Sequence, residues 1–338
     1  MKHNKVLIIY TGGTIGMVQD DNGALHPFAL ERIIDAVPQL RHASYDIDSH
    51  QLSRLIDSSN MNPTMWVEIA DAIEREYDNY DGFVVLHGTD TMAYTASALS
   101  FMFEHLAKPI VLTGSQLPLG MLRSDGRENI ICALEIASTH LFTIPEVCIF
   151  FQSRLYRGNR STKVSAEEFS AFDSFNYPSL AQAGISINCR NELVLPRHTL
   201  PLQVHKHFCT DVAILKLYPG ITEAVARAIL DLPSLRGIVL ETYGSGNAPT
   251  EPWFINAVRN AVDRGVIVID VTQCKSGSVE LCRYEASCDI SQAGVIGGRD
   301  ITVEAAITKL MFLLGQYPDD REKVKKLFTQ SLRGEMTI

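Results

Sequence analysis

The sequence lacks an excess of basic residues, since its 30 lysines and arginines are outnumbered by 39 aspartates and glutamates. The formal net charge of -9 argues against a surface for nucleic acid or for an anionic membrane, because such surfaces need clustered lysine and arginine. Long apolar runs are also missing. The run at Val6–Tyr10 is too short for the core of a signal peptide, and no later run approaches the length of a membrane span.

Paired cysteine motifs and nucleotide-binding signatures are missing too. The seven cysteines are odd in number and include no Cys-x-x-Cys pair, so we expect reduced thiols, no zinc site and a cytoplasmic protein. No G-x-x-x-x-G-K-[ST] motif occurs, and Thr11–Gly16 lacks the spacing of G-x-G-x-x-G. Gly244-Ser245-Gly246 does not match the G-x-S-x-G turn of the α/β-hydrolases. These absences argue against the familiar nucleotide and serine-nucleophile sites.

Length and pattern predict two α/β domains. A chain of 338 residues exceeds one typical domain. Short β-rich runs alternate with helical patterns throughout, which is typical of parallel sheets with crossover helices. An irregular, proline-containing stretch without helical period separates two such regions. We therefore expect an N-terminal domain at 1–188, a linker at 189–210 and a C-terminal domain at 211–338.

Three predicted strands of the first domain each end in a glycine flanked by hydroxyl or carboxyl side chains. Val6–Tyr10 is followed by Gly12, Gly13 and Thr14, and the next such strand is followed by Gly88, Thr89 and Asp90. A third strand leads into Thr113-Gly114-Ser115-Gln116. Ligands of open parallel sheets bind beyond the carboxyl ends of the strands, so these ends predict a site.

Asp57-Ser58-Ser59 comes directly before a predicted helix that Asn62 caps and Pro63 begins. Small polar side chains there can hold an anion or an amine. Aspartate and serine are also common turn and capping residues, and the sequence by itself favours that simpler role.

A threonine hydroxyl is a weak nucleophile unless a base takes its proton. A lysine can be that base only when it is neutral, and an adjacent aspartate favours the charged form. Asp90 can orient Lys163, and Lys163 can deprotonate Thr89. Backbone N–H groups of the glycine turns would stabilise a developing oxyanion, by about 3 kcal/mol per donor in comparable sites.

At these residues the chain resembles the bacterial-type L-asparaginase family. Thr11–Gly16 and His87–Thr91 resemble its two signatures, and Tyr156–Lys163, Tyr243–Pro249 and Gly294–Gly298 extend the match in order. The resemblance implies the cytoplasmic type I branch, a larger flavodoxin-like N-terminal domain and a smaller C-terminal α/β domain. It also implies a homotetramer, a dimer of intimate dimers in which each active site is completed by a neighbouring subunit. No metal or organic cofactor is expected.

The resemblance further implies that Thr14 is the nucleophile that forms an acyl-enzyme, although the sequence does not decide which threonine attacks first. It assigns the remaining roles to residues of the first domain: Thr89, Asp90 and Lys163 as the second catalytic group, and Asp57, Ser58, Ser59, Thr89 and Asp90 as substrate contacts.

The chain departs from the family pattern in two places. Many members carry a tyrosine in the lid after the first signature, whereas no tyrosine lies between Tyr10 and Tyr45 here. In some type I relatives a tyrosine from the neighbouring subunit takes this part, and Tyr284 is the residue of this chain at the matching place. Asn247 is a second expected contribution from that subunit. Glu241 replaces the arginine of some allosterically regulated relatives, so regulation by a second asparagine is not implied.

The function expected from these residues is hydrolysis of L-asparagine to L-aspartate and ammonia. One alternative is a broader enzyme that also accepts glutamine. Another is the amidase component of a tRNA-linked amidotransferase, which usually has an added N-terminal module, whereas this chain begins just before its first predicted strand. The alternative from a different class is a non-catalytic amino-acid sensor with a degenerate site.

Overall fold

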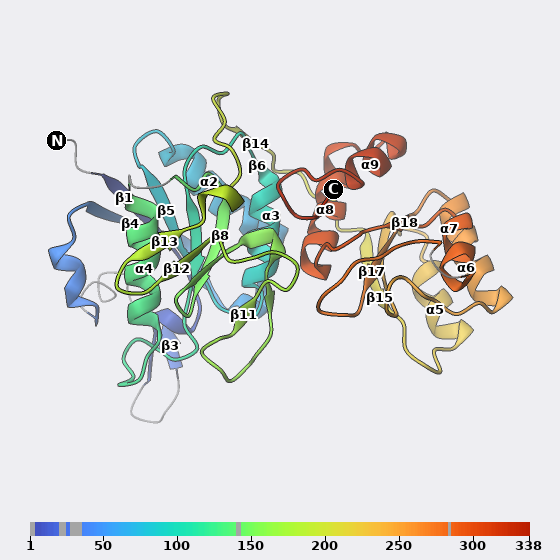
Figure 1. Ribbon diagram of the computed structural model, residues 1–338, viewed down its shortest axis with the longest axis horizontal. Coiled ribbons are helices and arrows are strands. Elements are labelled where there is room, and N and C mark those ends of the chain that lie inside the picture. Colours follow the sequence, from blue (N-terminus) through green and yellow to red (C-terminus); the bar gives the residue numbers. More distant parts are fainter. Residues whose placement is uncertain (1–3, 20–24, 28–35, 140–142, 283–284) are drawn as a thin grey trace. The chain divides into compact units, whose positions relative to one another are not determined.

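A computed structural model describes residues 4–19, 25–27, 36–139, 143–282 and 285–338 (Figure 1). The chain divides into two compact units, Met1–Lys206 and His207–Ile338. Each unit has a sheet with helices packed against it, so the two predicted α/β domains are confirmed. Among the helices of the described residues, none is long and apolar enough to cross a membrane.

The first unit contains an eight-stranded sheet in the order β13-β12-β9-β8-β7-β5-β1-β4. Five of its strands are parallel and keep the flavodoxin-like order, in which the second strand lies outside the first. Their side chains are almost all buried except along β4. These strands are β1 (Lys5–Gly12), β4 (Asp46–Ile56), β5 (Gly82–Leu86), β7 (Ile110–Thr113) and β8 (Val147–Phe151).

The other three strands make the sheet mixed. A two-residue turn joins β8 to β9 (Arg154–Arg157), and both of its residues, Gln152 and Ser153, have positive φ of 45° and 62°. This conformation matches the right-handed twist of a hairpin, so β9 returns antiparallel. The strands β12 (Ala181–Ala183) and β13 (Ile187–Cys189) extend the sheet in the same way. Because Gln-Ser is not a typical hairpin dipeptide, the sequence did not predict this extension.

Helices α2 (Pro63–Glu76), α3 (Met92–Met102) and α4 (Gly126–Ser138) pack on this sheet. The predicted cap of α2 is present, since the Asn62 side chain accepts from the Thr64 N–H at 3.0 Å. Short elements complete the unit. They are η1 (Thr14–Gly16), β2 (Met17–Gln19), β3 (Leu25–Pro27), η2 (Pro38–His42), η3 (Ser58–Asn60), β6 (Phe103–Glu104), η4 (Gly158–Arg160), β10 (Thr162–Lys163), β11 (Phe172–Asp173), η5 (Asn191–Leu193) and β14 (Gln203–Val204).

Residues after β13 still belong to the first unit. The strand β14 pairs with β6, and the buried Arg157 guanidinium donates to the Leu193 carbonyl at 2.8 Å. The compact units divide at Lys206, within the stretch expected as a linker. The boundaries at 1–188, 189–210 and 211–338 stay a prediction.

The second unit contains a four-stranded parallel sheet whose strands follow chain order. Thr302 caps α8 by accepting from the Ala305 N–H at 3.1 Å, as its sequence predicts. The elements are β15 (Val212–Lys216), α5 (Glu223–Leu230), β16 (Gly237–Thr242), α6 (Pro252–Asp263), β17 (Ile267–Thr272), α7 (Glu285–Gln292), β18 (Ile296–Gly297), α8 (Val303–Gln316) and α9 (Arg321–Phe328).

Candidate active site

The candidate site lies at the carboxyl ends of β1 and β5. In the flavodoxin-like strand order, β4 lies on one side of β1 and β5 lies on the other. Ligands bind at this point, where the strand order reverses. The strand β1 ends in Gly12 and Gly13, whose φ values are +116° and +88°. Such values strain any residue with a Cβ atom, so glycine is required there. The turn places the half-buried Thr14 at the start of η1.

Three turns pack closely beside Thr14. A Cβ atom added to Gly13 would lie 2.4 Å from the Gly88 nitrogen, and one added to Gly88 would lie 2.5 Å from the Ser58 hydroxyl oxygen. The first signature, the second signature and the Asp57–Ser59 turn are therefore in direct contact. Glycine allows this approach because it has no side chain. Of the three strand ends expected to converge, those of β1 and β5 are thus in contact, and a Cβ atom added to Gly114 at the third would lie 2.3 Å from the His87 carbonyl oxygen.

Lys163 lies between Thr89 and Asp90. Its ammonium nitrogen is 2.8 Å from the Thr89 hydroxyl oxygen and 2.7 Å from Asp90 Oδ1. The Thr89 side chain is buried, whereas that of Lys163 is 19% exposed and that of Asp90 is 63% exposed. The strand β10, held by pairing with β11, carries Lys163 to this place. The threonine, the carboxylate and the amine thus form one hydrogen-bonded cluster at the edge of solvent.

Gln116 is a member of this cluster that the sequence analysis did not place among the site residues. Its side-chain oxygen accepts from the Thr89 hydroxyl at 3.2 Å. The Asp125 carboxylate accepts from the Gln116 backbone N–H at 3.0 Å, and the Gln116 side chain donates to the Glu168 carbonyl at 3.1 Å. The available signal was its position at the end of the third glycine-bearing strand.

The His87 side chain anchors the turn of the second signature, His87–Thr91. Its ring is fully buried, with Nδ1 2.6 Å from the Gly88 carbonyl oxygen and Nε2 2.9 Å from the Thr95 hydroxyl. Burial lowers the pKa of His87 to about 4, against the opposing effect of the Gly88 carbonyl. The imidazole is therefore neutral near pH 7, and it serves to fix the turn on the neighbouring helix.

The Asp57–Ser59 turn has the capping role considered from the sequence, and its role in holding a substrate stays a prediction. The Asp57 carboxylate caps η3 by accepting from the Ser59 N–H at 3.0 Å. The Thr91 hydroxyl donates to the Ser58 carbonyl at 2.7 Å, which ties the turn to the second signature. Ser58 is buried, whereas Asp57 and Ser59 are exposed beside the cluster. Some polar atoms of this turn therefore remain exposed and take no part in capping.

The two residues expected to act from a neighbouring subunit are in a different part of the chain. Asn247 ends a turn in the second unit, and Tyr284 lies outside the described residues. Within the described residues, no group of three or more histidine, cysteine, aspartate or glutamate side chains could hold a metal ion.

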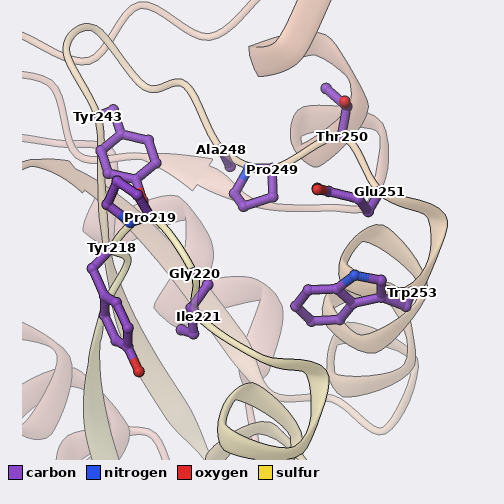
Figure 2. A pocket seen from close by; sticks show the side chains of 10 residues that line it. All are labelled: Tyr218, Pro219, Gly220, Ile221, Tyr243, Ala248, Pro249, Thr250, Glu251 and Trp253. Atoms are coloured by element: carbon purple, nitrogen blue, oxygen red, sulfur yellow. The ribbon is translucent and has the colours of Figure 1, made fainter.

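The second unit has a pocket of about 480 Å³ at the carboxyl ends of β15 and β16 (Figure 2). Its walls include Tyr218, Tyr243 and Trp253, and Figure 2 shows the Glu251 carboxylate above the Trp253 ring. None of the site residues predicted from the sequence lines it.

Comparison with known families gives two matches. The model for "Asparaginase, N-terminal" matches residues 5–195, and the model for "Glutaminase/Asparaginase C-terminal domain" matches residues 211–328. The two matches together cover most of both structural units.

Individual proteins resemble the chain over its whole length. L-asparaginase 1 of Escherichia coli K12 is 45% identical over 339 residues, which cover 100% of this chain and 99% of that protein. The crystal structure of L-asparaginase I from Vibrio cholerae covers 100% of both chains at 44% identity, with a TM-score of 0.91. A more distant relative is a component of the glutamyl-tRNA(Gln) amidotransferase of Pyrococcus abyssi, which is 33% identical over 98% of this chain and 77% of its own length.

Proposed function

The chain belongs to the asparaginase family, and from that premise we propose that it is an enzyme that hydrolyses L-asparagine to L-aspartate and ammonia. The observation that carries the proposal is the contact of Lys163 with both Thr89 and Asp90, beside the glycine turn that presents Thr14. The cluster offers a base, Lys163, and a carboxylate that orients it, Asp90, next to a hydroxyl, and a threonine nucleophile needs a nearby base to take its proton.

Thr14 is the proposed nucleophile. Its hydroxyl oxygen attacks the side-chain amide carbon of asparagine, and the hydroxyl proton is transferred to the amide nitrogen. The tetrahedral intermediate then collapses with loss of ammonia to leave a β-aspartyl ester on Thr14. Water then attacks the ester carbon, and L-aspartate leaves as the Thr14 hydroxyl regains its proton. The backbone N–H groups of the two glycine turns are the nearest donors for the oxyanion, and each such donor contributes about 3 kcal/mol in comparable enzymes.

Thr89, Asp90 and Lys163 form the proposed proton-transfer group. A lysine ammonium carries donors only, so Lys163 must release a proton before it can accept one from Thr89. Until then it donates to Thr89, and Thr89 donates to Gln116. Asp90 holds the amine in place at 2.7 Å. Gln116 keeps the Thr89 hydroxyl oriented and is a positioning residue.

Substrate binding is assigned to the exposed polar groups around this cluster. Much of the Asp90 carboxylate remains exposed after its contact with Lys163, so it can pair with the α-ammonium of asparagine. The Ser58 and Ser59 groups and the Asp57 carboxylate line the adjoining turn and supply contacts to the α-carboxylate and the amine. The carboxylate of Asp57 suits the amine, and the serine hydroxyls suit the carboxylate.

The assembly is proposed as a homotetramer, a dimer of intimate dimers in the cytoplasm. Asn247 and Tyr284 would then reach the active site of a neighbouring subunit, Tyr284 in place of the missing lid tyrosine. Support comes from the full-length relationship to the type I protein of Escherichia coli. A Tyr284→Phe variant with full activity in the intact assembly would contradict the assignment of Tyr284.

Glutamine is the competing substrate to measure, because the family model for the second domain names glutaminase as well as asparaginase. The two amides differ by one methylene, which a pocket distinguishes by about 1–3 kcal/mol. The preference between asparagine and glutamine is therefore given by the ratio of their kcat/KM values, measured on the pure protein.

Ammonia release by the purified protein tests the proposal, with L-asparagine and L-glutamine assayed in parallel. We expect turnover of asparagine, a loss of at least about 10³-fold in Thr14→Ala, and no change in Thr64→Ala, which removes an exposed threonine at the start of α2. Binding of asparagine by a folded assembly without release of ammonia would favour the sensor instead. Unchanged turnover in Thr14→Ala would reject Thr14 as the nucleophile.

A further inference from the structure

The second unit contains a carboxyl group with no solvent exposure. Asp270 lies in β17, between the partner strands β16 and β18, and its relative exposure is 0%. The Thr242 hydroxyl donates to Asp270 Oδ1 at 2.6 Å. The second oxygen, Oδ2, is buried and has no hydrogen-bond partner among the described residues. An ionised carboxylate in such a place would lack the donors that normally compensate its burial.

The surroundings of Asp270 favour its neutral form. Burial raises the pKa of Asp270 to about 7, and the Thr242 hydrogen bond lowers it only in part. Among the described residues, no charged neighbour contributes to the shift. The ionisable side chains on the described elements that pack against β17 are Glu241 on β16, Arg259 and Asp263 on α6, and Glu304 and Lys309 on α8. Tyr243, Glu280, Arg299 and Asp300 lie on the loops that adjoin these elements.

The free oxygen of Asp270 faces the turn that carries Asn247. A Cβ atom added to Gly246 would lie 2.9 Å from Asp270 Oδ2 and 3.1 Å from Val279. The turn is closed by a bond from the Asn247 N–H to the Tyr243 carbonyl at 2.8 Å, and by the reverse bond at 2.9 Å. Within the described part of the chain, the side-chain oxygen of Asn247 is also buried without a hydrogen-bond partner.

We propose that Asp270 is kept as a carboxylic acid and that it is a positioning residue for the Tyr243–Asn247 turn. The acid form fills the space beneath Gly246 without a buried charge, and its Oδ1 anchors Thr242 at the base of the turn. Loss of the proton leaves a carboxylate there that must gain water or donors. Water reaches the carboxylate only if the turn opens, and opening displaces Asn247.

The consequence for catalysis rests on the proposed function, in which Asn247 completes a neighbouring active site. Displacement of Asn247 weakens substrate binding and leaves the Thr14 and Lys163 chemistry in place. The proposal therefore gives the protein a pH response in KM that arises outside the catalytic cluster.

The protonation of Asp270 is tested without any assay of activity. Its folded pKa lies above the ordinary value of 3.8, so the folded state holds a proton that the unfolded chain has released. Stability from this group is complete below that ordinary pKa and is lost as the pH rises toward 7. Relative to Asp270→Asn, the unfolding constant of the wild type should rise about tenfold per pH unit in that interval.

Each unit contains one of the two tryptophans, so resonances of 5-fluorotryptophan at Trp66 and Trp253 report the unfolding of each separately. Asp300→Asn is the matched control, because Asp300 is a buried aspartate of the same unit whose carboxylate accepts from the Thr337 N–H and hydroxyl. It should keep the pH trend of the wild type. The infrared carbonyl band of a protonated carboxylic acid near pH 6 should disappear in Asp270→Asn and persist in Asp300→Asn.

The positioning role is tested in the intact assembly by the pH dependence of KM and kcat for asparagine. We expect KM of the wild type to rise on the order of tenfold between about pH 6 and pH 9, with a smaller change in kcat. This rise should be absent in Asp270→Asn, whose amide carries no titrating proton. It should also be absent in Asn247→Ala, where the turn has lost the group that it positions.

The stability measurement and the KM measurement test different parts of the proposal. A pH trend in stability that Asp270→Asn leaves intact would overturn the proposal, whatever the enzyme does. Loss of that trend together with an unchanged rise of KM in Asp270→Asn would overturn the positioning role. If asparagine is not turned over at all, the proposed function fails, and the stability and infrared results still decide the protonation of Asp270.

Discussion

The ammonium nitrogen of Lys163 lies 2.8 Å from the hydroxyl oxygen of Thr89, although the two residues are 74 positions apart in the sequence. The contact connects a strand end of the main sheet to a small two-stranded sheet at its edge. It places a potential base against a buried hydroxyl and leaves Asp90 on the solvent side. Changes to this cluster and to the contacts that support it should therefore have distinct effects on activity and on stability.

Lys163→Met should lower kcat for asparagine by about 10²–10⁴-fold, the usual contribution of a positioned acid or base. Stability should change little, because the Asp90 carboxylate is 63% exposed and keeps its contact with water when Lys163 is replaced. Lys206→Met is the matched control, since Lys206 is another lysine that pairs with carboxylates, those of Asp71 and Glu74. Steady-state kinetics of both variants make the comparison. Equal kcat values for the two would remove Lys163 from the mechanism.

Gly13→Ala should abolish turnover because the new Cβ atom would lie 2.4 Å from the Gly88 nitrogen and separate the two signature turns. Gly220→Ala provides the control at nearly the same φ, +89° against +88°, with no atom within 4 Å of the added group. It should show only the backbone strain of about 1–2 kcal/mol. Thermal unfolding and ammonia release distinguish the two effects. An active Gly13→Ala enzyme would mean that the close approach is not required.

Glu146→Ala should destabilise the first unit by about 3–5 kcal/mol, because it leaves the buried Arg157 guanidinium without its counter-charge. Glu146 accepts from Arg157 at 2.5 Å and from the Leu195 N–H at 2.6 Å, so the change also releases the segment after β13. Glu322→Ala breaks an exposed ion pair with Lys325 and should change stability far less. Urea unfolding measures both, and similar midpoints would refute the argument from burial.

His87 should make the first unit less stable in mild acid. Burial lowers its folded pKa to about 4 from 6.5, so the unfolded chain takes up a proton that the folded chain refuses. Its contribution is present above pH 6.5 and is lost as the pH falls toward 4, for a total of about 3 kcal/mol. Unfolding of His87→Gln, followed at Trp66, should lack this loss.

The His87 trend has the opposite sign to the one expected from Asp270 in the second unit. Measured relative to His87→Gln for the first unit and to Asp270→Asn for the second, the stabilities reported by the fluorotryptophan signals should therefore change with pH in opposite directions. A common direction in both units would contradict one of the two assignments.

The sequence by itself determined the strand ends and what they carry. Buried β-rich runs that end in glycine and threonine can be recognised from a short stretch of sequence. This is because a buried strand requires apolar residues and a positive φ favours glycine, whatever the rest of the chain contains. The same holds for the caps at Asn62 and Thr302, which lie directly before their helices. The family signatures are local in the same sense, and they located Thr14 and Thr89.

Only the tertiary structure decided how the side chains are brought together, even where the sequence and the family resemblance named the partners, as for Lys163 and Thr89. Lys163 reaches Thr89 because β10 pairs with β11, and Gln116 reaches it because β7 lies beside β5. The antiparallel edge of the first sheet depends on the backbone of Gln152 and Ser153, whose residue types do not require it. Asp270 shows the same limit: its residue type predicts a charge, and only its enclosure between two strands makes the neutral acid the stable form, because burial penalises charge without regard to sequence position.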